Sequence, residues 1–325
     1  MYVIPEFSSK KIQFNEYSIG KYTKPNVDNG LFRSVVYKGQ DIVCFSPPQS
    51  ILYDDFKKTD IYTVVVQEFI DGTMINLFYD GDWKLCTKSI MDANCKYYST
   101  KTFRELFHET NMDYSQLNKS LCYSFILQHP ENRIVTPIET PALYLIATYS
   151  IEGNVVREVY EPNSFLKPAS YIFETYEYAE KFVLKQPYTF KGLMFKINNQ
   201  RAKIRNPAYE KVKNLRGNTP DLKFNYLGLT TSAKQEYGQY FPTAEYEQEI
   251  EEFTKELHFL YINCFIQKTK ALKLYPGKYK CHMYKLHMIY LQELRLQSKI
   301  VTKKVVSDYI HKLHPAQLLF SFKYV

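Results

Sequence analysis

The chain of 325 residues contains no run of about 18 uninterrupted apolar residues, and no basic segment followed by an apolar stretch stands at its N-terminus. These absences predict a protein without a membrane span or a secretory signal peptide, and therefore an intracellular one. Internal repeats and low-complexity tracts are also absent. The sequence thus has the character of an ordinary folded protein.

Cysteine is scarce, with six residues scattered along the chain without short paired spacing. In a protein large enough to need no disulfide staples, this spacing predicts free thiols. Cys281, His282 and His287 lie close together, but they fall in a helical pattern and no partner pair of cysteines exists. We therefore predict no metal site.

Of the residues in the chain, 45% are hydrophobic and 23% are charged. This length and composition are sufficient for one large domain and one smaller domain, each with its own hydrophobic core. A net charge of +8 suits a polyanionic partner without requiring one. The 30 Tyr and 22 Phe can stack on nucleic-acid bases. A β-rich core in a Tyr-rich, Lys-rich composition explains them equally simply, and we favour that explanation.

Strand, turn and strand alternate through the first two hundred residues. Residues 64–89 give two strands around Asp71-Gly72, then a hairpin at Asp80-Gly81 and a third strand. Another hairpin is predicted from Gly192–Ile197 and Ala202–Arg205, joined by Asn198-Asn199-Gln200. We expect antiparallel sheets over this part of the chain.

Apolar spacings of three and four dominate the rest of the chain. Ile250, Phe253 and Leu257 follow an acidic first turn, and Thr302 is a suitable N-cap for a later helix. The sequence therefore predicts an α+β protein, with an antiparallel-sheet domain over residues 1–225 and an all-helical C-terminal domain over residues 226–325.

Several segments in order resemble the phage-type RNA ligase family, whose members adenylate a lysine and then seal RNA ends. The matching segments are Phe32–Tyr37, Phe45–Pro48, Phe69–Thr73, Tyr123–Phe125, Asn132–Val135, Lys191–Met194 and Lys203–Tyr209. The resemblance covers roughly residues 30–220 and implies an ATP-grasp-like ligase, or nucleotidyltransferase, fold. The segments Asp71–Asn76 and Gln128–Val135 also resemble those of ligase-like proteins of large DNA viruses, which implies a viral setting.

The resemblance also implies what has changed in the site. The nucleophilic lysine corresponds to Phe69, and two glutamates of the family correspond to Ser124 and Lys191. An aromatic ring cannot form a lysine phosphoamide. A shift in register could instead make Lys84 or Lys88 the nucleophile, but both fall on the predicted return strand.

The phosphate-facing part of the family pattern is retained. The candidate nucleotide- or phosphate-binding residues are Arg33, Asp71, Gly72, Arg133, Lys203 and Arg205, with Asn132 also matching. Structural roles compete with these assignments. Asp71-Gly72 can be a tight turn, Asn132-Arg133 can cap one, and Lys203 and Arg205 can lie on an exposed strand face.

From these residues we predict a pseudo-ligase without catalytic or metal-binding residues and without a required cofactor. It would serve as an RNA- or nucleotide-binding module or as part of a viral protein complex, in the host cytoplasm or the virion, with no membrane partner. The alternatives are an active RNA ligase using ATP and Mg²⁺, and a purely structural virion or complex scaffold.

Overall fold

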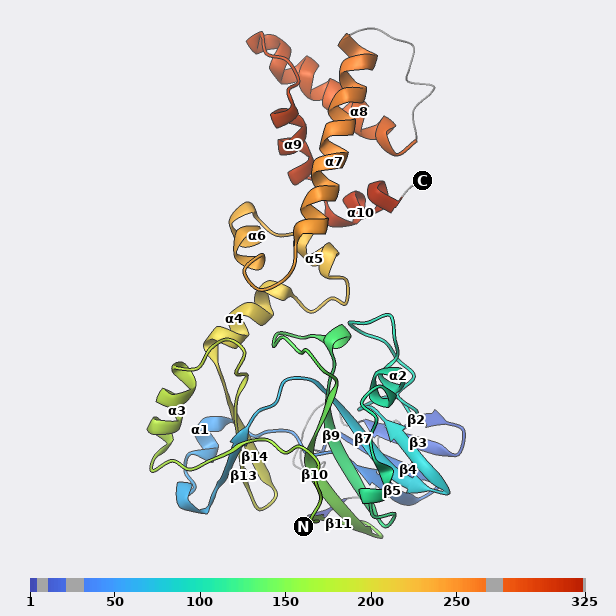
Figure 1. Cartoon of the computed structure of the whole chain (residues 1–325), viewed down its shortest axis with the longest axis vertical. Coiled ribbons are helices and arrows are strands. Elements are labelled where there is room, and N and C mark those ends of the chain that lie inside the picture. The colour runs from blue at the N-terminus through green and yellow to red at the C-terminus, as the bar shows by residue number, and fades with distance from the viewer. Residues whose placement is uncertain (5–10, 22–31, 267–276, 324–325) are drawn as a thin grey trace. The chain divides into compact units, whose positions relative to one another are not determined.

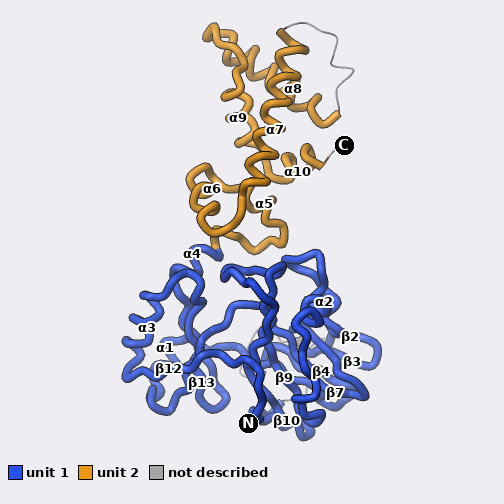
Figure 2. The backbone as a smooth tube through the Cα atoms, viewed as in Figure 1, with its two compact units in different colours: residues 1–213 blue, residues 214–325 orange. Residues whose placement is uncertain are grey.

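The computed structural model describes residues 1–4, 11–21, 32–266 and 277–323. The chain divides into two compact units, residues 1–213 and residues 214–325 (Figure 2). The division falls inside helix α4 (Pro207–Arg216), twelve residues before the boundary predicted at 225. Our assignment of separate roles to the two parts stays a prediction.

Unit 1 contains three antiparallel sheets (Figure 1). The largest has six strands, in the order β1 (Tyr2–Val3), β11 (Val155–Val159), β10 (Ala142–Glu152), β9 (Leu121–Gln128), β7 (Thr73–Asp80) and β8 (Asp82–Cys86). A second sheet has the order β12 (Ser170–Tyr171), β6 (Val65–Glu68), β13 (Gly192–Ile197) and β14 (Gln200–Arg205). The third follows chain order through β2 (Lys11–Phe14), β3 (Tyr17–Lys21), β4 (Ser34–Lys38) and β5 (Asp41–Phe45).

The central strands of the six-stranded sheet are buried on both faces. On one face, Phe78 and Tyr149 pack with Val35 and Phe45 of the third sheet. On the other, Ile75, Leu77 and Phe125 belong to a cluster that also contains Leu106 and Phe107 of helix α2 (Phe103–His108). Burial on both sides explains why Ile75, Leu77 and Phe78 place apolar side chains on both faces of β7, where Asn76 is the buried polar exception.

Trp83, the single tryptophan of the chain, lies on β8 at the edge of the second of these clusters. Its ring meets that of Tyr79 edge to face, with 5.3 Å between ring centroids. The hairpin that carries both residues turns at Gly81, which has a φ of +73°. The predicted Asp80-Gly81 hairpin is confirmed.

A third cluster supports the four-stranded sheet of β12, β6, β13 and β14. Phe56 of helix α1 (Tyr53–Phe56) and Val183 of helix α3 (Tyr176–Leu184) pack against Leu193 and Phe195 of β13. These two helices lie beside β13 and β14 in Figure 1. The sheet therefore has one face covered, and its other face is available to line a cleft.

Unit 2 is helical throughout its described residues, 214–266 and 277–323. Its helices are α5 (Leu222–Leu227), α6 (Thr231–Tyr237), α7 (Ala244–Tyr261), α8 (Gly277–Ile289), α9 (Lys303–His311) and α10 (Pro315–Lys323). Leu257, Met283, Leu286 and Val306 meet in one fully buried cluster. Antiparallel sheets followed by helices confirm the predicted α+β class, and Thr302 caps α9 by accepting from the Val305 N–H.

Among the described residues, no helix is long and apolar enough to cross a membrane.

Candidate functional site

A small cavity in unit 1 gathers cationic side chains. We call it the basic cavity: it measures about 130 Å³ and is lined by Arg33, Pro48, Gln49, Ser50, Phe69, Met74, Met194, Arg201 and Lys203. The lining comes from β7, β13, β14 and the segments before β4 and after β5 and β6. It thus brings together residues from five of the segments that carry the family resemblance.

The three cations of the basic cavity have no counter-ion among the described residues. Arg33, Arg201 and Lys203 form no ion pair with any of them, and the buried Nε of Arg201 has no hydrogen-bond partner there. Burial lowers the pKa of Lys203 to about 8, and the neighbouring Arg205 and Arg33 contribute to that shift. The cavity therefore holds uncompensated positive charge, which an anion would neutralise.

Two amines approach the ring of Phe69, the residue that we predicted at the nucleophile position. Lys191 Nζ lies 4.2 Å and Lys203 Nζ 5.7 Å from the ring centroid. Both distances fall within the range of cation–π attraction. The ring therefore holds two ammonium groups close together where the family places one reactive amine.

Asp71 is buried, and its carboxylate is already engaged. Oδ2 accepts from the N–H groups of Val135 and Thr136, both at 3.2 Å, and Oδ1 accepts from the Tyr209 hydroxyl at 2.7 Å. Lys191 Nζ lies 3.5 Å from Oδ1 and also donates to the Ile70 carbonyl. Burial lowers the pKa of Lys191, and the Asp71 carboxylate opposes that shift.

Ser124 is the first member of a buried hydrogen-bond network of polar side chains. Its hydroxyl donates to Asn76 Oδ1 at 2.7 Å, and Asn76 Nδ2 donates to Ser46 Oγ at 2.8 Å. Ser46 in turn lies 2.9 Å from Ser34 Oγ. Ser124, which we predicted at the position of a family glutamate, is therefore a hydrogen-bonded, uncharged part of the core.

Gly72 places the turn after Phe69 directly against strand β9. Its φ is +145°, and a Cβ built there would lie 2.5 Å from the Leu127 carbonyl oxygen. Gly192, at the start of β13, has the same φ, and its Cβ would lie 2.0 Å from the Ile204 carbonyl oxygen. Glycine at these two positions is required by close backbone approach.

Not every predicted site residue reaches the basic cavity. Arg205 Nη1 pairs with Glu210 at 3.1 Å, and Arg133 Nε donates to the Val135 carbonyl at 3.0 Å. Asn132 Nδ2 donates to Thr73 Oγ1, which ties the segment after β9 to the start of β7. Only Arg33 and Lys203 of the six predicted binding residues line the cavity.

Arg201 was missed by the sequence analysis, although it supplies the third cation. A usable signal exists: Arg201, Lys203 and Arg205 are two residues apart, so they lie on the same face of β14. The segment that resembles the family begins at Lys203, two residues after Arg201, and so does not include Arg201.

Lys84 and Lys88, the alternative nucleophiles, lie outside the lining of the basic cavity. Lys84 Nζ pairs with Asp82 at 2.6 Å on strand β8, and Lys88 is exposed. The alternative register thus gains no support from the arrangement around Phe69.

The resemblance implies ATP and Mg²⁺ for active members, and Mg²⁺ does not fit the groups present. The positions of the two family glutamates carry a hydroxyl bound to Asn76 and an ammonium, and Asp71 is already engaged by four donors. Mg²⁺ prefers carboxylate oxygens that are free to coordinate. We derive no reaction step through either group.

Elsewhere, the ligand atoms of Glu109, His129 and Glu131 lie within 4.8 Å of one another, as in a metal site. The ammonium of Lys101 already lies among them, 2.8 Å from Glu109 and 2.6 Å from Glu131. This group is an ion-pair network of the α2 region. It is separate from the basic cavity, whose lining includes none of these residues.

Sequence comparison identifies the chain as a relative of ligase-like nucleotidyltransferases, with homologues in viruses, and confirms the predicted resemblance. One relative is an RNA ligase of Rhodothermus phage RM378, 38% identical over 99 residues. Another is the immediate-early protein ICP-46 homolog of Invertebrate iridescent virus 6, 26% identical over 297 residues. The matches cover 26% and 76% of this chain, and 23% and 65% of the respective relatives.

No protein-family model matches the chain. Among solved structures, a putative ATP-dependent DNA ligase from Aquifex aeolicus has a TM-score of 0.46 and 13% sequence identity, over 87% of this chain and 77% of that one.

Proposed function

We propose that the chain is a pseudo-ligase: a ligase-like protein that no longer seals RNA and binds RNA or nucleotide phosphate in the basic cavity. The observation that carries this proposal is the set of three cations without a counter-ion around Phe69, formed by Arg33, Arg201 and Lys203. Arg and Lys side chains directed at one small cavity are typical of phosphate recognition.

The proposed loss of sealing rests on Phe69, Ser124 and Lys191 together. A phenyl ring offers no amine, the Ser124 hydroxyl is used inside the core, and the Lys191 amine is held by Asp71. Groups that act as a unit in catalysis lose nearly the whole rate when one of them is removed. We propose that ATP and Mg²⁺ are not required for the protein's role.

The alternative is an active ATP-dependent RNA ligase, and covalent labelling decides between the two. The full chain is incubated with α-³²P-labelled ATP and Mg²⁺ and then resolved by denaturing electrophoresis. We expect no labelled protein band. A band would overturn the pseudo-ligase proposal, and its loss in Lys191→Met, Lys203→Met or Lys84→Met would identify the amine that carries the nucleotide.

Phosphate binding is tested by fluorescence anisotropy with a short labelled oligoadenylate at several salt concentrations. The double variant Arg33→Ala, Lys203→Ala should bind at least about tenfold more weakly. The slope of log affinity against log salt should flatten by about 1.4, since each lost contact to single-stranded nucleic acid contributes about 0.7.

A matched control removes the same number of charges outside the basic cavity. Lys58→Ala, Lys185→Ala serves, because both lysines are exposed and neither lines the cavity. This variant should retain the affinity and the salt slope. Equal losses in the two double variants would mean that net charge alone drives binding, and would contradict a site at the basic cavity.

The setting of the protein is also a proposal. Relatives from a phage and from an iridescent virus support a role in viral infection. We propose the host cytoplasm or the virion as the place of action, with RNA rather than a scaffold partner as the ligand. A protein that binds no RNA in the anisotropy experiment would leave the scaffold role as the better explanation.

A further inference from the structure

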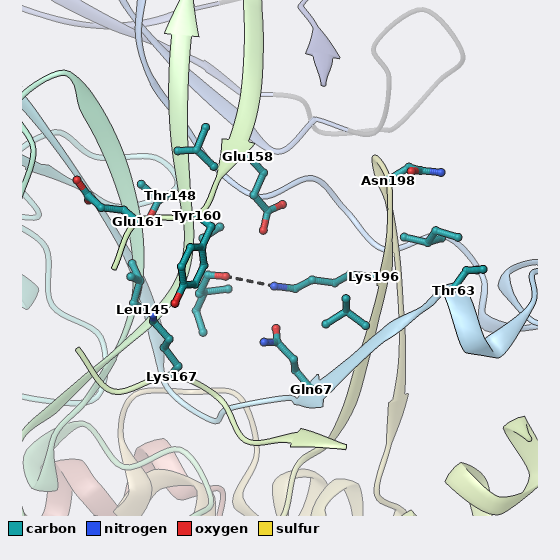
Figure 3. Close-up of a pocket in the computed structure, with 15 residues that line it drawn as sticks. Thr63, Gln67, Leu145, Thr148, Glu158, Tyr160, Glu161, Lys167, Lys196 and Asn198 are labelled. Carbon is teal, nitrogen blue, oxygen red and sulfur yellow. Dashed lines mark hydrogen bonds between the residues drawn. The ribbon is translucent and has the colours of Figure 1, made fainter. Parts of the chain in front are cut away.

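A larger cavity lies beside the basic cavity in unit 1. It measures about 500 Å³ and lies between strands β10 and β11 on one side and β6 and β13 on the other (Figure 3). The two cavities share no lining residue. A narrow space of about 30 Å³ lies between them, lined by Lys196 of the larger cavity and by Phe69, Met74, Met194 and Arg201 of the basic cavity. We call the larger one the β10–β13 cavity.

The β10–β13 cavity has a mainly apolar wall. Val65, Leu145, Ile146, Val159 and Ile197 contribute to its lining. A volume of this size falls within the range of small-molecule sites, which extends from about 300 to 1,000 Å³. The wall would favour a ligand with an apolar body.

The ammonium of Lys196 projects into this cavity, whose lining also includes Lys167, Glu158 and Glu161. Lys196 extends from β13 into the β10–β13 cavity, as Figure 3 shows, and its Nζ donates to the Ile146 carbonyl at 3.2 Å. That carbonyl belongs to the bulge in β10 between Leu145 and Ala147, where the ladder with β9 is interrupted. A lysine ammonium has three donors, so a single carbonyl leaves it able to donate to a ligand.

The charged groups around Lys196 leave this ammonium without a close anion. Lys196 forms no ion pair with a described residue, although Glu158 on β11 also lines the cavity. The Glu161 carboxylate accepts from the Tyr123 hydroxyl at 2.6 Å, and Lys167 Nζ lies 5.0 Å from the ring centroid of Tyr160.

Burial lowers the pKa of Lys196 to about 8; Arg201 on β14 contributes to the shift, and Glu158 opposes it. A buried cation whose charge is costly gains most from an anionic ligand.

We propose that the β10–β13 cavity binds a small organic monoanion with an aromatic or apolar body, whose carboxylate accepts a hydrogen bond from Lys196 Nζ. The ligand's body lies against the apolar wall, and Tyr160, which is 83% exposed, covers it at the rim. This site is independent of the phosphate site proposed above, because it uses different residues.

The first test uses 2-naphthoate as the probe and isothermal titration calorimetry on the full chain. We expect saturable binding with one site. Affinity should fall about tenfold between pH 7 and pH 9, because the ammonium fraction of a group with a pKa of about 8 falls by roughly that factor. The neutral probe 2-naphthalenemethanol should bind with no such pH dependence.

Two variants locate the site. Lys196→Gln should weaken 2-naphthoate binding at least about tenfold and remove its pH dependence while leaving 2-naphthalenemethanol binding nearly unchanged. Val159→Phe keeps the ammonium but fills part of the cavity, so it should weaken both probes. If Lys196→Gln fails to fold, the wild-type pH series and Val159→Phe decide the question.

The outcomes separate this proposal from the phosphate site. Lys196→Gln should leave oligoadenylate affinity unchanged, and the Arg33→Ala, Lys203→Ala variant should leave 2-naphthoate affinity unchanged. Absence of saturable naphthoate binding would overturn the proposal. So would binding that responds to the Arg33 and Lys203 substitutions but not to Val159→Phe, because the probe would then occupy the basic cavity.

Discussion

Asp71 and Lys191 form a buried pair that connects the turn after β6 with the start of β13. In the resemblance, these positions belong to a reactive site. In this chain each charge balances the other, and Phe69 covers the ammonium. The residues around the family's nucleophile position thus contribute to stability.

Asp71→Asn is expected to destabilise the protein by about 3–5 kcal/mol at pH 7, because it leaves the Lys191 ammonium buried without its counter-ion. Urea unfolding followed by circular dichroism measures the loss. The double variant Asp71→Asn, Lys191→Met should lose less than Asp71→Asn alone, since the unpaired charge is gone. Equal losses would mean that the Asp71 hydrogen bonds, and not the charge pair, dominate.

We expect Lys203 to make oligoadenylate binding depend on pH. Its pKa of about 8 results from burial and from the nearby Arg205, Arg33, Lys191 and Arg201, all of which are cationic. As pH rises from 7 to 9, Lys203 loses its proton, so affinity should fall several-fold, with a limit of about tenfold. The Lys203→Arg variant should bind oligoadenylate at pH 7 without this fall in affinity between pH 7 and pH 9, which we call the pH step, because the guanidinium group stays charged.

A persistent pH step in Lys203→Arg would assign the titration to another group. Lys196→Gln is the control, since Lys196 also has a pKa of about 8 but does not line the basic cavity. That variant should retain the pH step in oligoadenylate binding. Comparison of the Lys203→Arg and Lys196→Gln variants thus shows, with oligoadenylate as the single probe, which of the two lysines causes the pH dependence.

At the scale of elements, the segment from β6 to β7 depends on a glycine that no side chain can replace. Gly72→Ala would place a methyl group 2.5 Å from the Leu127 carbonyl oxygen, at a φ of +145°. We expect a loss of stability on the order of 3 kcal/mol. Thermal unfolding monitored by circular dichroism measures it.

Gly39→Ala is the matched control for that substitution. Gly39 also has a positive φ, +60°, but a methyl group at this position would meet nothing within 4 Å. The Gly39→Ala variant should lose about 1 kcal/mol of folding stability, which is the cost of the left-handed conformation alone. Similar losses of stability in the two variants would show that strand β9 can move away from the added methyl group at residue 72 at little energetic cost.

Hairpins were predictable from the sequence, because the residues of the turn and of the two adjoining strands follow one another directly in the chain. The Asp80-Gly81 turn fixes the β7–β8 hairpin, and the Asn198-Asn199 turn fixes β13–β14. Pairing between distant segments was not predictable. Strand β1 pairs with β11 more than 150 residues away, and no turn chemistry determines that register.

The candidate site was predictable only in part, for the same reason. Arg33 and Lys203 were found because they lie in segments that resemble a family, and both line the basic cavity. The pairing of Arg205 with Glu210 required knowing where α4 begins relative to β14. The β10–β13 cavity depends on a bulge at Leu145 and on packing between two sheets, neither of which has a sequence signature.

At the scale of the whole molecule, each unit has its own buried clusters. Among the described residues, one buried apolar cluster lies in unit 2 and three lie in unit 1. Separate cores allow separate unfolding.

Leu257→Ala should destabilise unit 2 by about 2–5 kcal/mol, since Leu257 is fully buried in its cluster. Hydrogen exchange measured by mass spectrometry should show faster exchange confined to peptides from residues 214–323. Leu106→Ala, an equally buried leucine of unit 1, should accelerate exchange only in unit 1. Acceleration of both units by either substitution would contradict independent unfolding.

The position of Trp83 gives the two units different optical signals. Because the single tryptophan lies in unit 1, its emission reports the unfolding of that unit alone. Ellipticity at the helical wavelengths is weighted toward unit 2, which contains helices α5 to α10. One unlabelled sample, heated once and followed by both signals, thus resolves two melting curves and assigns each to its part of the chain.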